Sequence, residues 1–180
     1  MAYTNIYPTN KRLTPRTIQF TNKTQVSTFQ SPFTGTQQML RWNGAWCEIN
    51  ATLSPLAQAD AEEITAFLNG LYGQTNAFYF NLPSKFLIPA SVSLTISANG
   101  TDFIGATPTP TVGKWGVDNN KRLVQFVSTS SVWPNLLPGS NTISPSTTGA
   151  LFRLASSDTS YSVDQFIFSS VTIAMVTLAQ

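Results

Sequence analysis

The strongest structural signal in the chain is the stretch MLRWNGAWCEINATL, residues 39–53. Apolar side chains occupy every second position from Cys47 to Leu53, with more polar ones between them, which predicts a strand with one buried face. Asn43-Gly44 is the dipeptide that a two-residue type I′ turn prefers, because both central residues of that turn need a positive φ. The stretch therefore predicts a β-hairpin in which residues 39–42 form the partner strand.

The following segment carries the clearest helical pattern. Ser54 suits a helix cap, and Pro55 suits the first helical position. Apolar residues recur with the spacing of one helix face at Ile64, Phe67, Leu68 and Leu71. We expect one helix over about residues 55–70, with this apolar stripe buried against a sheet.

Short apolar runs separated by turn signals fill the rest of the chain. Residues 129–149 are rich in Ser, Thr, Pro and Gly, which is typical of a long surface loop. Residues 171–178 are largely apolar on both alternating faces, which predicts a strand buried on both sides. The pattern predicts a mainly β fold, a β-sandwich or barrel with one flanking α-helix and hairpins. Because no repeat or linker divides residues 37–180, we expect them to form a single domain.

Residues 1–36 are rich in Thr, Asn, Gln and Pro. Only Ile18 and Phe20 show a short alternation, which predicts one paired segment within an extended N-terminal arm. Two interpretations are open for the arm. It is either a loosely packed terminus or a segment that becomes ordered on a neighbouring subunit.

The composition excludes several classes of function. Only 10% of the residues are charged and the net charge is +2, so nucleic-acid binding, which needs clustered cations, is not expected. The chain has no His and a single Cys, Cys47, so we expect no metal site, no cofactor and no internal disulfide. Residues 166–178 are shorter than the ~20 apolar residues of a membrane helix, so no membrane insertion is expected.

The acidic residues show no spacing that marks a catalytic pair. Those at positions 60–63 share one short helical segment, where a solvated face is expected. Asp102, Asp118 and Asp158 lie in turn-like contexts, where Asp commonly makes local hydrogen bonds. Nucleophile motifs such as Gly-x-Ser-x-Gly are absent, and Cys47 is expected to be a small core residue. We therefore expect no enzymatic activity; a hydrolase, the rival reading, would need a cleft with close carboxylates.

Aromatic side chains are the remaining candidate functional groups. Tyr and Trp are enriched at subunit interfaces, and two tryptophans flank the predicted hairpin turn. We predict an interface that includes Ile18, Phe20, Arg41, Trp42 and Trp46. The alternative is a stacking platform for a glycan, to which Trp115 and Trp133 would also contribute.

The low charge also favours self-association, because a surface with few charges has little electrostatic protection against it. Edge strands present unpaired backbone groups that another subunit can extend. These features predict a subunit of a symmetric assembly.

Residues 24–83 contain a series of motifs: SPFTGTQ at residues 31–37, the strand around Trp46, LSPL at 53–56, AFLNGLYG at 66–73 and FYFNLP at 78–83. In these motifs the segment resembles virion structural proteins from the tail tip of tailed bacteriophages. Distal tail proteins are the family that the chain resembles. The resemblance implies a β-sandwich with one helix and a hairpin, and copies that form a ring, most commonly a hexamer.

The same resemblance implies the partners and the location of the protein. The ring would join the tail tube to the tip or baseplate, so the neighbours would be tail-tube and tail-tip or hub proteins. The protein would be assembled in the host cytoplasm and reside in the virion tail. We thus expect a non-enzymatic tail subunit. The alternatives are a glycan-binding module of a tail or receptor-binding protein and a capsid or decoration protein.

Overall fold

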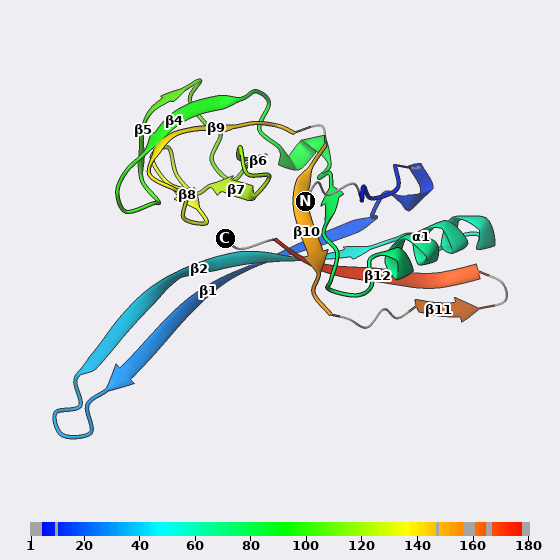
Figure 1. Ribbon diagram of the computed structural model, residues 1–180, viewed down its shortest axis with the longest axis horizontal. Coiled ribbons are helices and arrows are strands. Elements are labelled where there is room, and N and C mark those ends of the chain that lie inside the picture. Colours follow the sequence, from blue (N-terminus) through cyan, green and yellow to red (C-terminus); the bar gives the residue numbers. More distant parts are fainter. Residues whose placement is uncertain (1–4, 10, 147, 157–160, 165–166, 178–180) are drawn as a thin grey trace.

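The computed structural model describes residues 5–9, 11–146, 148–156, 161–164 and 167–177 (Figure 1). These residues form three antiparallel sheets and one α-helix, α1 (Gln58–Gly70). The predicted mainly β fold with a single flanking helix is confirmed. The helix begins later than predicted, because its N-cap is Ala57, which makes no side-chain capping bond, and not Ser54.

The largest sheet has six strands and contains the C-terminal end of the described chain. Its order is β1-β2-β12-β10-β3, and β11 pairs with the outer part of β12. The strands are β1 (Thr17–Gln30), β2 (Gln37–Thr52), β3 (Phe78–Phe80), β10 (Ala150–Leu154), β11 (Tyr161–Asp164) and β12 (Ile167–Thr177). One 3-10 turn, η1 (Lys11–Leu13), precedes β1.

The predicted turn at Asn43-Gly44 is wrong. β2 runs through these residues without reversing, and Gly44 has no positive φ. The chain reverses instead at residues 31–36, so that β1 pairs with β2 at thirteen positions. Asn43-Gly44 lies in a bulge, because Thr24 pairs with Ala45 but Val26 pairs with Arg41. A turn at Asn43-Gly44 would have left β1 without this long partner.

The face of β2 that was predicted to be buried packs into the main hydrophobic core. Cys47, Ile49 and Ala51 are fully buried. The apolar stripe of α1 packs over the same core through Ile64 and Leu68. Each such aliphatic side chain contributes roughly 1.5–3 kcal/mol when it is fully buried. The alternation of β2 and the burial of the helix stripe are therefore confirmed.

β12 differs from its prediction. Ile173 and Met175 are buried, but Thr172 on the other face is exposed and Ala174 and Val176 are only half-buried. β12 lies between β2 and β10, and the helix covers only one side of the sheet. A strand at the centre of a sheet can be apolar on both faces and still leave one of them partly open.

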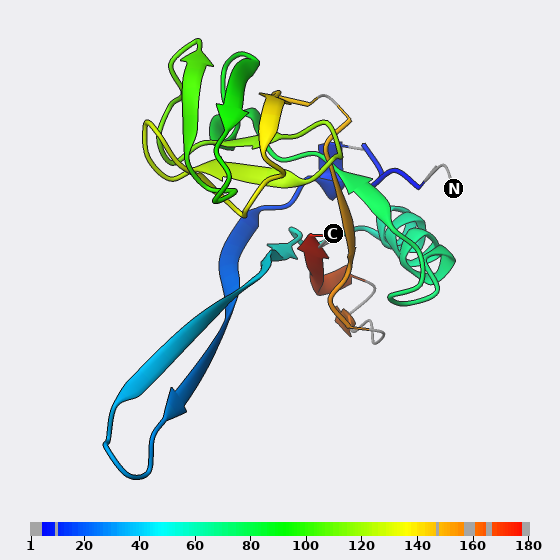
Figure 2. The same cartoon turned by 60° about the vertical axis from the view of Figure 1, so that its left-hand side comes forward.

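Residues 81–149 form an inserted unit between β3 and β10, which pair directly through Phe80 and Ala150. Its two three-stranded sheets contain β4 (Val92–Ile96), β5 (Phe103–Thr107) and β9 (Gly139–Ile143), and β6 (Trp115–Val117), β7 (Leu123–Phe126) and β8 (Val132–Trp133). The 3-10 turn η2 (Ser84–Phe86) opens the unit. Figure 2 shows it as a separate group of strands on one side of the large sheet.

The inserted unit has a hydrophobic cluster of its own around Ile88, Phe126 and Ile143. The predicted surface loop at residues 129–149 is therefore wrong, because this segment contributes β8, β9 and the buried Ile143. The unit is joined to the main sheet by Trp115, which stacks on Phe20 of β1 with 5.1 Å between ring centroids. Whether residues 37–180 fold as one domain stays a prediction.

The predicted arm is bonded within its own chain where the structure describes it. Tyr7 donates its backbone N–H to Tyr79 of β3, and Asn5 accepts from the Tyr79 N–H. Residues 17–30 pair with β2. Contact of the arm with a neighbouring subunit stays a prediction.

Gly149 offers a test of the junction between the inserted unit and the sheet. It has φ +84°, and an added Cβ would lie 2.2 Å from the Phe80 carbonyl oxygen. Gly149→Ala should lower the free energy of unfolding by about 3 kcal/mol or more, because the backbone of β3 or β10 must shift. Urea unfolding measures this loss.

Gly113→Ala is the matched control, because Gly113 has φ +82° but no atom within 4 Å of an added Cβ. It should cost only the left-handed strain of about 1–2 kcal/mol. If the two variants lost the same free energy of unfolding, the close approach of β3 would not be the reason for glycine at position 149.

Candidate assembly interface

The outer part of the β1–β2 hairpin projects from the body of the molecule. β12 pairs with β2 only at residues 48–52, so residues 25–41, which we term the outer ribbon, have no third strand among the residues that the structure describes. Figure 1 and Figure 2 both show this ribbon extending away from the rest of the fold. An isolated two-stranded hairpin is at best marginally stable in water, so a partner surface would stabilise this one.

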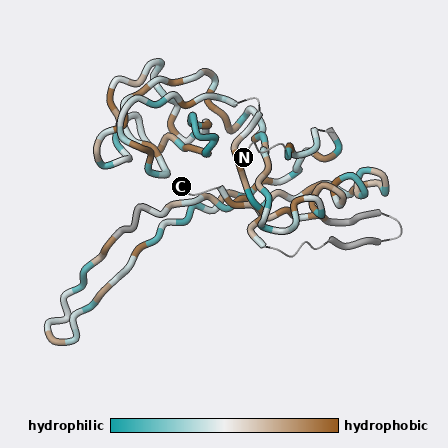
Figure 3. Tube along the Cα trace, viewed as in Figure 1, coloured by the Kyte–Doolittle hydropathy of each residue, from teal (hydrophilic) through white to brown (hydrophobic). Residues whose placement is uncertain are grey.

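The outer ribbon exposes large apolar side chains. The exposed fraction is 94% for Phe33, 70% for Met39 and 65% for Phe29. Leu40 and Val26 are also exposed, and apolar residues recur along the ribbon in Figure 3. Scattered exposed apolar residues are ordinary, but a cluster of this kind marks an interaction surface.

Both faces of the outer ribbon carry these residues. Phe29 pairs with Gln38, and the next pair on the same face joins Leu40 to Ser27. The opposite face carries Val26 and Met39. A ribbon that lay flat on one surface would cover only one of these faces, so the pattern fits a ribbon that is held on both sides.

The tip of the ribbon is held by its own hydrogen bonds. Ser31 donates its backbone N–H to Thr36 O (2.9 Å) and accepts from Gly35 N–H (3.0 Å). The hydroxyl groups of Thr34 and Thr36 are 2.7 Å apart. The turn thus forms without any packing of Phe33, whose ring is left to water or to a partner.

The five predicted interface residues are distributed along the hairpin. Ile18 and Phe20 are half-buried and pack against the main core of their own chain. Trp46 is half-buried on the opposite face, where its indole N–H donates to the Glu48 carboxylate at 3.3 Å. Arg41 and Trp42 belong to β2, but their side chains lie outside the described part of the structure. Their role at an interface stays a prediction.

The apolar residues of the outer ribbon were not among the predicted interface residues. A signal was present, since Val26, Phe29 and Phe33 stand in a segment otherwise made of Thr, Ser, Gln and Pro. Such a segment has too few apolar residues to bury a core of its own, so each large one is more informative than it would be in a regular strand.

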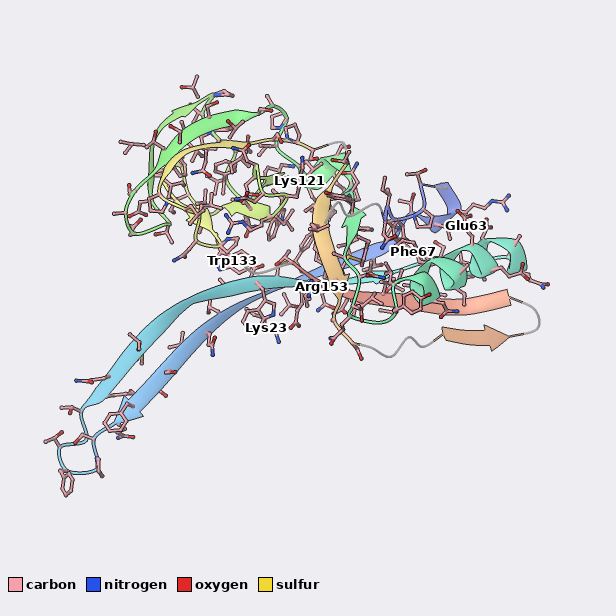
Figure 4. The ribbon with its side chains drawn as sticks, in the orientation of Figure 1. Lys23, Glu63, Phe67, Lys121, Trp133 and Arg153 are labelled. Atoms are coloured by element: carbon pink, nitrogen blue, oxygen red, sulfur yellow. The ribbon has the colours of Figure 1, made fainter. Side chains whose placement is uncertain are left out.

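Two of the four tryptophans are unavailable for an exposed stacking platform. Trp115 and Trp133 are 4% and 8% exposed, and their rings pack edge to face. Figure 4 places Trp133 between the inserted unit and the large sheet. These two side chains join parts of the fold and do not offer a ring face to a glycan.

The described acidic side chains that are most buried have structural partners. Asp60, expected on a solvated face, is 8% exposed and lies 3.4 Å from Arg12. Asp118 pairs with Arg122 at 2.8 Å and accepts backbone N–H groups of residues 120 and 122. It therefore holds the turn before β7, as expected for Asp in a turn. Asp158 lies outside the described residues.

No group of three potential metal ligands occurs among the residues that the structure describes. In the same part of the chain, no helix has the length and apolar character needed to cross a membrane. Comparison with protein-family models and with curated proteins gives no match for the chain.

Cys47 offers a test of the core beneath the hairpin. Burial raises the pKa of its thiol from about 9 to about 12, so the thiol stays protonated and should resist alkylation at pH 8 in the folded protein. In the unfolded chain the thiol ionises near its ordinary pKa. Unfolding between pH 9 and 12 thus releases a proton, and stability should fall as pH rises through this range.

Iodoacetamide labelling followed by mass spectrometry checks the first expectation, with the urea-unfolded protein as the reactive control. Urea unfolding of Cys47→Ala and of the parent protein at pH 8 and pH 10.5 checks the second. Rapid labelling of the folded protein would contradict the buried position of the thiol.

Hydrogen exchange tests the outer ribbon directly. In the dilute protein, amides at residues 26–30 and 37–41 should exchange much faster than those at 17–23 and 46–52, because only the inner part is supported by β12 and the core. Mass spectrometry of peptic fragments resolves the two parts. Equal protection of both parts in a verified monomer would contradict an unsupported ribbon.

Proposed function

We propose that the protein is a non-enzymatic structural subunit of a bacteriophage tail. It forms a ring as a distal tail or hub protein that joins the tail tube to the tip or baseplate. The observation that carries this proposal is the outer ribbon, a projecting two-stranded hairpin with exposed apolar side chains on both faces. Such a ribbon gains stability only when other surfaces cover it.

The low charge of the chain supports assembly with itself and with neighbouring tail proteins. Only 18 of 180 residues are Lys, Arg, Asp or Glu. Because charged residues are so few, an interface on this surface removes few charges from water, and its desolvation cost is small.

The sheet order supports the same proposal. β1 is the edge strand of the six-stranded sheet, and its outer half is exposed along its whole length. An edge strand can accept backbone hydrogen bonds from another chain. A subunit that offers an edge strand and an apolar ribbon has two means of joining its neighbours.

The sequence resemblance supplies the tail as the location. Its first motif, residues 31–37, falls at the tip of the outer ribbon, and its later motifs fall at the end of α1 and on β3. A mainly β fold with one helix agrees with what the resemblance implies. The proposed partners are copies of the chain in a hexameric ring and adjoining tube and tip proteins. No nucleic acid, membrane or cofactor has a role in the proposal.

The double variant Phe29→Ser, Met39→Ser tests assembly through the ribbon, because it removes one large apolar side chain from each face. The parent protein should sediment as an oligomer at high concentration, and the variant should dissociate at concentrations at least about tenfold higher than the parent. Analytical ultracentrifugation over a concentration series measures this shift.

Ile104→Ser is the matched control, since Ile104 is 69% exposed but lies on β5, away from the ribbon. It should sediment like the parent. A parent protein that stays monomeric at millimolar concentration would contradict self-assembly. A reconstruction of the intact particle with the chain outside the tail would contradict the proposed location.

A further inference from the structure

A groove lies between the N-terminal segment and the end of β3. Its volume is about 460 Å³, and its walls include Ile6, Pro8, Pro15, Tyr79, Leu82 and Pro83. None of the residues that line it is charged. Ile6 is 57% exposed at its rim, so the groove presents apolar surface that the described chain leaves uncovered.

The groove is preformed. The Tyr7 ring packs edge to face on Phe67 and Phe80, with centroid distances of 5.7 and 5.1 Å. The Tyr7 hydroxyl donates to Leu13 O at 2.8 Å. The backbone N–H and C=O of Tyr79 are both hydrogen-bonded to the N-terminal segment. Prolines with fixed φ complete the walls. A ligand that enters such a site pays little to order it.

We propose that this groove receives the tip of the outer ribbon, with Phe33 as the inserted side chain, from a second copy of the chain. The inference rests on the proposed function and names the contact by which the subunits join. An aromatic side chain that enters a preformed apolar pocket is the usual centre of a protein interface. The volume of the groove lies in the range of pockets that hold drug-sized ligands, so it has room for one aromatic side chain.

The chemistry of the two surfaces matches. The tip sequence SPFTGT, residues 31–36, has no charged residue, and the groove has none either. Neither surface therefore loses the hydration of a charge when the two meet. The tip is already shaped by its own hydrogen bonds, so Phe33 enters without an ordering cost for the turn.

The positions of the two surfaces require a second molecule. The ribbon extends away from the body, and the N-terminal segment lies on the far side of the molecule from the tip in both Figure 1 and Figure 2. A tip cannot reach the groove of its own chain. Because tip and groove are different surfaces, each subunit gives one contact and receives one, which is a head-to-tail arrangement that closes into a ring when the rotation permits.

Matched charge insertions test this contact. Phe33→Asp disables the tip, and Ile6→Asp disables the groove at an exposed position that leaves the core intact. Each variant alone should self-associate at least about tenfold more weakly than the parent. Ile104→Asp places the same charge on another exposed residue, on β5, and should assemble like the parent.

Mixing the two defective variants gives the decisive result. Phe33→Asp retains a groove and Ile6→Asp retains a tip, so the mixture should form a one-to-one dimer that does not extend. Sedimentation of the mixture, with one variant carrying a fluorescent label, detects this dimer. Thr148→Trp, at another exposed position in the groove, replaces Ile6→Asp if circular dichroism shows that the latter is misfolded.

The outcomes separate this inference from the proposed function. If the parent assembles and both groove variants assemble equally well, the tip binds elsewhere, for example to another tip or another tail protein, and the inference is wrong while the tail function stands. Absence of the dimer in the mixture would also overturn it. If the parent itself stays monomeric at high concentration, both proposals fail.

Discussion

The antiparallel pairing of β1 with β2 links the hydrophobic core of the molecule to its outer ribbon. Its inner half is fixed by the core, because the buried face of β2 can meet β12 and α1 in only one register. Its outer half continues in the same register with no core beneath it. The same hydrogen-bond ladder therefore anchors the sheet and carries an apolar ribbon into solvent, where no described part of the chain covers it.

The sequence predicted the elements whose pattern is local. The alternation from Cys47 to Leu53 and the helical spacing from Ile64 to Leu71 each report burial on one face, and both were correct. The predicted turn at Asn43-Gly44 was wrong, because the turn preference of two residues stabilises the chain less than pairing with a strand that is distant in sequence. Thirteen backbone pairs with β1 outweigh the preference of one dipeptide. The Ser-rich region at 129–149 failed for a related reason, since its few apolar residues complete a core built by other strands.

The candidate interface was harder to predict, because its exposure depends on the absence of a neighbouring strand beside the outer ribbon in the described part of the structure. Phe29 and Met39 have the same alternation as core residues elsewhere in the chain, and the only local sign of their exposure is the scarcity of other apolar residues around Phe29. They are exposed because, among the described residues, the pairing of β12 with β2 ends at Glu48. The glycan alternative failed for a related reason. Trp115, a candidate for the stacking platform, is buried and stacks on Phe20, so it joins the inserted unit to the sheet.

An exposed apolar ribbon is a liability for a free subunit, and the chain carries few of the usual protections. Charged residues and prolines commonly protect edge strands from pairing with other chains, but the outer ribbon, residues 25–41, has only one proline, Pro32, and one charged residue, Arg41. Because this edge has little such protection, it is prone to pair with other chains unless a specific partner covers it. Apolar side chains on both faces also mean that one flat contact is insufficient, because a simple dimer would leave half of the ribbon in water. In a closed ring, each subunit would contact its neighbour through its ribbon and would bind the ribbon of the next subunit, so no ribbon would be uncovered. Growth of the assembly would end when the ring closes, without a separate capping protein.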